Sequence, residues 1–210
     1  MGRAGMKPAE IEASNRHYAQ NLARLRDPAQ VCDWGGPGSQ RARFRVLAAV
    51  GDLAGRSVLD VGCGLGALSE WFAETGLEVD YTGIDLCPDI VAAARVRSPR
   101  GRFEVRDLLA DLPSERWDWV LSSGIFNRVY EDNHGFVERM LGAIFASCRL
   151  GIAANFITTW ADPGSIGPET FQVEPAWLLG RARALSRRVA FRHDYLPHDG
   201  TIYVYRDGAP

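Results

Sequence analysis

Short apolar runs rich in β-branched residues alternate with helix-length stretches along the chain, and this alternation constrains the fold most. The predicted strands are Arg56–Val61, Val79–Ile84, Arg102–Val105, Trp117–Leu121 and Gly151–Ile157. The predicted helices between them are Ala67–Thr75, Pro88–Val96 and Phe136–Cys148. Strands separated by helices form βαβ units, which build a mostly parallel sheet with helices on both faces. We therefore predict an α/β fold with a doubly wound sheet.

Both ends of the chain extend this pattern. Before the first strand, apolar spacing predicts a helix over Ala9–Arg26 and a second helix capped by Ser39. After the last parallel strand, the apolar runs Arg188–His193 and Thr201–Arg206 are joined by the tight, polar turn Pro197–Gly200. This arrangement predicts an antiparallel hairpin that closes the sheet.

The length of 210 residues fits one domain over residues 1–210. Within it we expect an N-terminal helical cap over 1–37 and a core over 38–210. A loop around 158–175 is rich in glycine and proline, and we expect it to cover the site as a lid.

Composition narrows the classes of function. Hydrophobic residues make up 46% and charged residues 24%, as in soluble globular proteins. The net charge of -2 gives no basic field, which disfavours nucleic acid and favours a small-molecule partner. No apolar run reaches the roughly 20 residues of a membrane span, and the N-terminus lacks a secretion signal. The four cysteines include no C-x-x-C pair, so we expect neither a zinc site nor disulfides, which fits a cytoplasmic protein. The sequence leaves the oligomeric state open.

A strand that ends in a glycine cluster carries most of the chemical information. Residues 58–66 read Val-Leu-Asp-Val-Gly-Cys-Gly-Leu-Gly, with Asp60 in the strand and Gly62, Gly64 and Gly66 after it. Such turns bind nucleotides in α/β sheets, but the dinucleotide pattern is G-x-G-x-x-G and this chain has G-x-G-x-G. The Asp60 carboxylate would repel the negative charge of a pyrophosphate, whereas it would attract a ligand that carries an ammonium and a sulfonium.

Acidic residues also follow the next two strands, at Asp85 and Asp107. The alternatives are a tight turn without a ligand for the glycines and a turn cap for Asp107. Because acids recur at the ends of three successive strands, we favour a ligand site.

With these motifs in this order, the chain resembles the S-adenosylmethionine-dependent methyltransferases of the Rossmann-like class, over about Ser39–Arg206. The resemblance implies a Rossmann-like doubly wound sheet, mostly parallel, with an antiparallel C-terminal hairpin and helices on both faces. It also implies S-adenosyl-L-methionine as the cofactor and a small-molecule acceptor for the methyl group.

The resemblance further implies roles for individual residues. Asp85 looks like the acid that takes both ribose hydroxyls, and Asp107 like the acid beside the adenine. Gln40 or Arg43 is a candidate for the cofactor carboxylate, although an arginine on an amphipathic helix is also commonly a solvated residue. The expected cofactor-binding residues are Asp60, Gly62, Cys63, Gly64, Asp85, Leu86, Asp107, Leu108, Ser122, Ser123, Gln40 and Arg43.

A narrower resemblance is to one subfamily of small bacterial methyltransferases whose substrate is unknown. It rests on seven short stretches, which are Trp34-Gly35, Ser39-Gln40, Arg43-Phe44, Ser123–Asn127, Gly151–Phe156, His193–Pro197 and Ile202–Arg206. Gly200 departs from that pattern, in which an aromatic residue is more usual at this position.

We expect catalysis to depend on positioning rather than on a dedicated base. Asn127 is the leading candidate because its loop should face the sulfonium, and Tyr18, Tyr130 and His193 are weaker candidates. The histidines lack Cys or His partners at metal spacing, so no metal site is predicted. A flat or apolar acceptor is suggested by the aromatic residues of the two caps, Tyr18, Trp34, Trp160 and Phe171.

Two other functions stay open on the sequence. One is a nicotinamide-dependent oxidoreductase, against which Asp60 and the glycine spacing argue. The other is a protein that binds S-adenosylmethionine without methylating anything.

Overall fold

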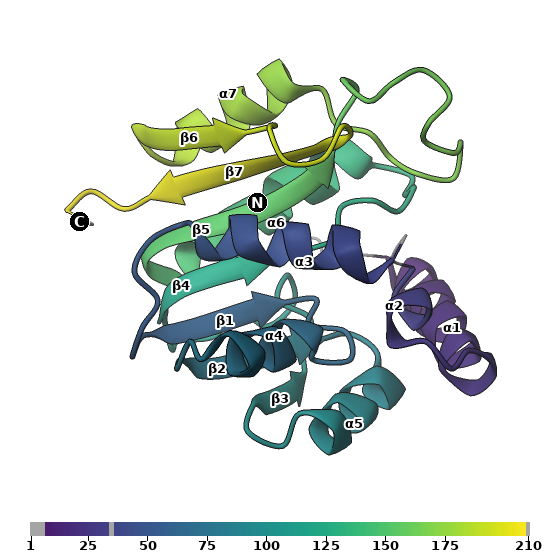
Figure 1. Cartoon of the computed structure of the whole chain (residues 1–210). Coiled ribbons are helices and arrows are strands. Elements are labelled where there is room, and N and C mark those ends of the chain that lie inside the picture. The colour runs from purple at the N-terminus through teal and green to yellow at the C-terminus, as the bar shows by residue number, and fades with distance from the viewer. Residues whose placement is uncertain (1–6, 34–35, 209–210) are drawn as a thin grey trace.

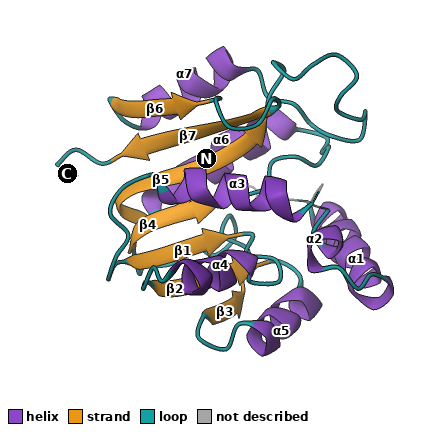
Figure 2. Ribbon diagram, viewed as in Figure 1, coloured by secondary structure: helices purple, strands orange, loops and turns teal. Residues whose placement is uncertain are grey.

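Seven strands form one twisted sheet through the centre of the structure (Figures 1 and 2). The computed structural model describes residues 7–33 and 36–208. The strands are β1 Ser57–Val61, β2 Asp80–Asp85, β3 Arg102–Val105, β4 Trp117–Ser122, β5 Cys148–Ile157, β6 Arg188–Arg192 and β7 Asp199–Tyr205. The helices are α1 Pro8–Arg24, α2 Pro28–Val31, α3 Pro37–Ala48, α4 Ala67–Thr75, α5 Pro88–Arg97, α6 Asn133–Ala146 and α7 Pro175–Leu185.

The strand order is β3-β2-β1-β4-β5-β7-β6. The first five strands in this order pair in parallel, and β7 is antiparallel to both β5 and β6. From β1 the chain builds the sheet outward through β2 to β3 on one side. It then crosses to β4 on the other side of β1 and continues to β5, so the strand order reverses between β1 and β4. Ligands of open α/β sheets bind at such a point, outside the carboxyl ends of the strands. The predicted fold class and its C-terminal hairpin are confirmed.

Helices cover both faces of the sheet, because strand side chains alternate between the two faces. Val58 packs with the buried apolar residues of α3, α4 and α5. Leu59, the next residue along β1, packs with those of α6 and α7 on the other face. The strands of the middle of the sheet are therefore buried on both sides, which explains why they are nearly continuous apolar runs.

The first two helices lie beyond the carboxyl ends of the parallel strands (Figure 1). Tyr18, Leu22 and Leu25 pack against a small apolar cluster that includes Leu65 of the glycine turn and Ile90 of α5. The N-terminal segment is thus placed over the edge of the sheet where a ligand would bind. Trp34 and Gly35, which contributed to the narrower resemblance, lie outside the described residues.

Helix starts differ most from the sequence-based predictions. Helix α3 begins at Pro37, and Ser39 lies inside its first turn, where its hydroxyl donates to the Gly36 carbonyl oxygen at 2.9 Å. Proline is well suited to the first helical position because its fixed φ matches the helix and its missing N–H is not needed there. Helix α6 begins at Asn133 because the Asp132 side chain caps it.

The C-terminal third also contains differences. Helix α7 was not predicted at all, although the Glu174 side chain caps it by accepting from two backbone N–H groups. Asp199 and Gly200 were assigned to the hairpin turn, but they are the first residues of β7, where Gly200 pairs with Phe156 of β5. A side chain at Gly200 would come within 2.7 Å of the Phe191 ring, so the packing of β6 against β7 keeps this position small.

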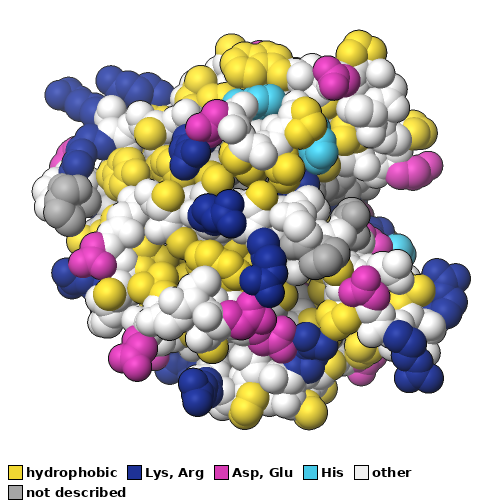
Figure 3. Space-filling model, in the orientation of Figure 1, with side chains coloured by type: hydrophobic (Ala, Val, Ile, Leu, Met, Phe, Trp, Pro, Cys, Tyr) yellow, Lys and Arg dark blue, Asp and Glu magenta, His cyan; other side chains and the backbone are white. Residues whose placement is uncertain are grey.

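Two surface properties bear on partners. No helix in the described ranges is long and apolar enough to cross a bilayer. On the face in Figure 3, the basic side chains are scattered among acidic and hydrophobic ones rather than gathered into one patch.

Candidate functional site

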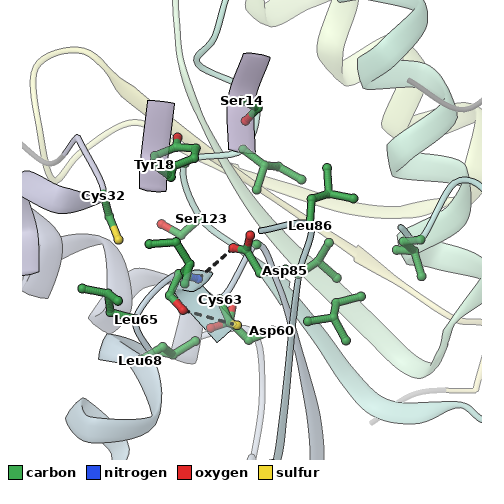
Figure 4. Close-up of a pocket in the computed structure, with 18 of the residues that line it drawn as sticks. Ser14, Tyr18, Cys32, Asp60, Cys63, Leu65, Leu68, Asp85, Leu86 and Ser123 are labelled. Carbon is green, nitrogen blue, oxygen red and sulfur yellow. Dashed lines mark hydrogen bonds between the residues drawn. The ribbon is translucent and has the colours of Figure 1, made fainter. Parts of the chain in front are cut away.

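A pocket lies where the carboxyl ends of β1 to β4 meet α1, at the reversal of strand order (Figure 4). The residues after β1 to β4 that line it include Asp60, Gly62, Cys63, Gly64, Asp85, Leu86, Arg106, Asp107, Leu108, Ser123 and Gly124. The residues contributed by helices and longer loops include Ser14, Asn15, Tyr18, Cys32, Gln40, Arg128, Tyr130, Phe136 and Met140. Nine of the twelve residues expected to bind the cofactor are therefore among the strand-end set, and Gln40 is a tenth.

The glycine turn after β1 depends on the absence of side chains. Gly62 and Gly64 have φ values of +77° and +52°, a region that other residues avoid. A Cβ at Gly62 would lie 2.1 Å from Cγ2 of Ile125, and one at Gly64 would lie 2.9 Å from Sγ of Cys32. The turn is packed from above by the loop after β4 and by the end of α2, so its backbone forms the floor of the pocket.

Asp60 is buried on β1 at the inner end of the pocket. Its carboxylate accepts a hydrogen bond of 2.7 Å from the hydroxyl of Tyr81. Burial raises the pKa of Asp60 to about 7, the Tyr81 hydrogen bond partly offsets this rise, and the charge of Asp85 adds to it. A cationic group bound beside Asp60 would favour its ionised form and lower that pKa.

Asp85 fixes the turn and faces the pocket at the same time. One carboxylate oxygen accepts from the backbone N–H of Gly64 at 3.0 Å (Figure 4). The other accepts from the backbone N–H of Cys87, also at 3.0 Å. Burial raises the pKa of Asp85, and the backbone donors oppose that rise. Each carboxylate oxygen has two lone pairs, so Asp85 keeps acceptor capacity for a ligand diol.

Asp107 combines the two interpretations that its position allowed. One of its oxygens accepts from the backbone N–H of Leu109 at 2.9 Å and of Ala110 at 3.4 Å, so it does cap the turn after β3. It also lines the pocket together with the buried Leu108. Its predicted contact with adenine remains a prediction.

The two serines after β4 separate into different roles. Ser122 is fully buried, and its hydroxyl donates to the Val61 carbonyl oxygen at 2.9 Å, outside the pocket lining. Ser123 lines the pocket and bonds with the buried side chain of Asn155, whose Oδ1 also accepts from the Gly124 N–H. Sequence reasoning missed Asn155, although an amide in the apolar run of β5 was a detectable signal.

Arg43 is placed differently from the expectation. It is buried, and its Nε forms an ion pair of 2.7 Å with the buried Asp199 at the start of β7. His198 lies 3.5 Å from the same guanidinium. Arg43 does not line the pocket, whereas Gln40, one helical turn earlier, does. A buried carboxylate requires a counter-ion, and Asp199 takes the one that α3 provides.

Of the four candidates for catalysis, two line the pocket and two do not. Tyr18 and Tyr130 line the pocket, and burial raises the pKa of both hydroxyls, so both stay neutral phenols near pH 7. Asn127 lies beside the pocket rather than in its lining, and its carbonyl oxygen accepts from the Phe171 N–H at 2.8 Å. His193 is further away, with Nε2 at 2.8 Å from the Thr158 hydroxyl.

The loop at 158–175 is connected to this side of the pocket. Thr158 and Val173 form a parallel bridge at its two ends, and Thr170 forms an antiparallel bridge with Arg128. Trp160 is 56% exposed and packs its ring near that of His193, at a centroid distance of 5.3 Å. The mobility of this loop remains a prediction.

The chain is similar in sequence to known methyltransferases. A family model described as "Methyltransferase domain" matches residues 58–144. The Mycobacterium tuberculosis protein named "Putative methyltransferase Rv1506c" is 32% identical over 153 residues, an alignment that covers 70% of this chain and 92% of that protein. The "Ubiquinone biosynthesis O-methyltransferase" of Xanthomonas oryzae is 46% identical over 63 residues, which span 30% of this chain and 26% of that enzyme.

Among solved structures, the fold is similar to that of magnesium protoporphyrin IX methyltransferase from Synechocystis, determined with bound S-adenosylmethionine. The TM-score is 0.66 at 18% identity, with 94% of this chain and 95% of that chain covered. The mycobacterial relative is aligned over most of its length and the sheet has the methyltransferase topology, so the chain belongs to the Rossmann-like, class I S-adenosylmethionine-dependent methyltransferases.

Proposed function

We propose that the pocket over β1 and β2 binds S-adenosylmethionine and that the protein transfers its methyl group to a small-molecule acceptor. The observation that carries this proposal is the convergence of Asp60, Asp85 and Asp107 on one pocket floored by a glycine turn. These three side chains come from separate strands, and only the parallel sheet brings them together.

The chemistry of this residue set fits the cofactor. The Asp60 carboxylate suits the ammonium group, since its pKa of about 7 allows ionisation when a cation binds beside it. The Asp85 carboxylate suits the ribose diol, and Asp107 with the Leu108 backbone suits the adenine edge. Gly62 and Gly64 let the backbone approach the methionine portion closely.

The chain's residues then have three tasks in the reaction. When bound, the cofactor supplies a methyl group that its sulfonium already activates. The protein orients an acceptor in line with that methyl, and it excludes water from the space between α1 and the strand ends. Tyr18 and Tyr130 stay protonated near pH 7, so we assign them hydrogen-bond donation and positioning rather than proton abstraction.

The organisation and location of the protein are part of the same proposal. We propose a single domain in which the segment before residue 38 and the loop at 158–175 cover the core, in a cytoplasmic protein. All four cysteines are free thiols, which is the state typical of a reducing compartment. The scattered basic side chains on the face shown in Figure 3 and the net charge of -2 support a small molecule rather than nucleic acid as the partner.

The second candidate is a protein that binds the cofactor without transferring its methyl. The pocket opposes this alternative, because the lining extends past the strand ends to Tyr130, Phe136 and Met140, beyond the residues assigned to the cofactor. That additional wall provides a place for an acceptor.

Calorimetry with S-adenosylmethionine, S-adenosylhomocysteine and NAD tests the binding part of the proposal. We expect micromolar binding of both sulfur compounds and none of NAD. The Asp85→Asn variant keeps the size of the side chain but loses its charge and one of the two oxygens that accept from the turn, so its affinity should fall about tenfold to a hundredfold. Tight binding of NAD, or normal binding by Asp85→Asn, would contradict the assignment, and product analysis with labelled methyl groups separates an enzyme from a binder.

A further inference from the structure

The pocket has a second wall that the cofactor assignment leaves unexplained. It consists of Asn15 and Tyr18 on α1 with Arg128 and Tyr130 on the segment between β4 and α6. Most of the residues assigned to the cofactor lie at the ends of β1, β2 and β3, whereas Arg128 and Tyr130 follow β4 on the other side of the strand reversal. We define these four residues as the acceptor wall.

Arg128 gives the acceptor wall a positive charge that the protein neutralises weakly. Its nearest carboxylate is that of Asp33, with an Nη1–Oδ2 distance of 3.9 Å. The same carboxylate is contacted more closely by His17 at 2.8 Å and by the Asn21 amide at 3.1 Å. The Arg128 guanidinium also lies over the Tyr18 ring, 5.6 Å from its centroid, which orients it along the wall.

A second arginine in the same lining behaves differently. Arg106 contacts Glu104 at 3.3 Å and Asp111 at 3.5 Å, so two carboxylates balance its charge. Of the cationic residues that line the pocket in the described ranges, Arg128 is therefore the less neutralised one.

The acceptor wall also contains a buried polar atom without a hydrogen-bond partner. Oδ1 of Asn15 is buried, and no protein atom in residues 7–33 and 36–208 hydrogen-bonds it. A buried amide oxygen without a partner costs about 1–3 kcal/mol unless a ligand or water satisfies it. The neutral hydroxyls of Tyr18 and Tyr130 lie on the same wall and are able to donate to an anion.

We infer that the acceptor carries an acidic group, a carboxylate or a similar oxyanion, which Arg128 binds with the acceptor wall. This inference rests on the proposed methyl transfer. Besides Arg128, the charged side chains that line the pocket are Asp60, Asp85 and Asp107, which would repel an anionic acceptor, and Arg106, whose charge two carboxylates already balance. With it, the acidic group is held at one end while Phe136 and Met140 contact the apolar remainder.

The test measures binding of matched ligands to the protein saturated with S-adenosylhomocysteine. The probes are small carboxylates and their uncharged amides, such as 4-hydroxybenzoate with 4-hydroxybenzamide and 3-phenylpropionate with its amide. Wild-type protein should bind the carboxylates about tenfold to a hundredfold more tightly than the amides. Arg128→Gln should abolish the preference, Arg128→Lys should keep part of it, and Arg106→Gln is the matched control that should keep all of it.

Other outcomes would overturn either this inference or the proposed function, and the two cases can be distinguished. Equal or absent binding of carboxylates and amides by the wild type would overturn the inference. The compound 5′-methylthioadenosine lacks the amino acid portion of S-adenosylhomocysteine. If Arg128→Gln lost affinity for S-adenosylhomocysteine but not for 5′-methylthioadenosine, Arg128 would bind the cofactor carboxylate, and the inference would be overturned. If the wild-type protein bound no S-adenosylhomocysteine at all, the proposed function itself would fail.

Discussion

Ionisation of Asp60 should be coupled to cofactor binding. In the free protein burial raises the Asp60 pKa to about 7, so the carboxyl is about nine-tenths protonated at pH 6 and about one-tenth protonated at pH 8. The ammonium of S-adenosylhomocysteine, bound beside Asp60, favours the carboxylate. Binding at pH 6 should therefore release close to one proton, and affinity should fall about tenfold for each pH unit below 7.

Calorimetry in buffers of different ionisation enthalpy counts these protons. We expect about 0.9 proton released at pH 6 and about 0.1 at pH 8. Asp60→Asn should release none at either pH and bind more weakly at pH 8. Tyr81→Phe removes the donor that stabilises the carboxylate, so it should move the whole pH dependence upward by about one unit. Equal proton release at pH 6 and pH 8 in the wild type would refute this coupling.

The same carboxyl affects the free energy of unfolding in a defined direction. Its folded-state pKa lies above the ordinary value of 3.8, so the folded protein binds the proton more tightly than the unfolded chain. The stability that Asp60 contributes is therefore fully present below about pH 4 and is lost as the pH rises to about 7, by up to about 4 kcal/mol. Asp60→Asn should lack this component in urea unfolding measured across that range.

Three further predictions concern packing and the remaining titratable groups. Gly62→Ala should destabilise the protein by about 2–5 kcal/mol in urea unfolding. The control Gly55→Ala has a similar φ of +66° but open space around it, so it should cost only about 1–2 kcal/mol, and equal effects would contradict the packing of the turn. Asp199→Ala removes the buried carboxylate paired with Arg43 and should cost about 3–5 kcal/mol by the same method, so a loss below 1 kcal/mol would be inconsistent with the ion pair. His193→Ala should reduce turnover by less than about a hundredfold because His193 lies outside the pocket lining, and a thousandfold loss with unchanged cofactor binding would instead indicate a general base.

The sequence predicted the parallel core well because each element there is bounded by local signals. Strand β3 at Arg102–Val105 and helix α4 at Ala67–Thr75 have the predicted bounds. The positive-φ glycines Gly66 and Gly76 bound α4, and the central strands are apolar runs buried on both faces, whereas the edge strand β3 follows Gly101 and has only Phe103 buried. Helix α7 was missed because the predicted Gly- and Pro-rich loop ended at Pro175, the first residue of the helix, and no element was predicted for 176–187.

In the site, too, residues placed by local signals were predictable, and residues placed by contacts distant in sequence were not. The positions of Asp60, Asp85 and Asp107 followed from strand ends, so their convergence was predictable. The partner of Arg43 was not, because Asp199 is brought to it by the antiparallel pairing of β7 with β5. Arg128 also gave no signal, since its place in the pocket depends on how α1 packs over the strand ends.

A crystal structure with S-adenosylhomocysteine tests the central claim most directly. We expect the ribose hydroxyls on the Asp85 carboxylate, the adenine beside Asp107, and the homocysteine portion over the Gly62–Gly64 turn with its ammonium near Asp60. Binding of the ligand elsewhere, or with its adenosine over β4 and its amino acid portion over β3, would contradict the account.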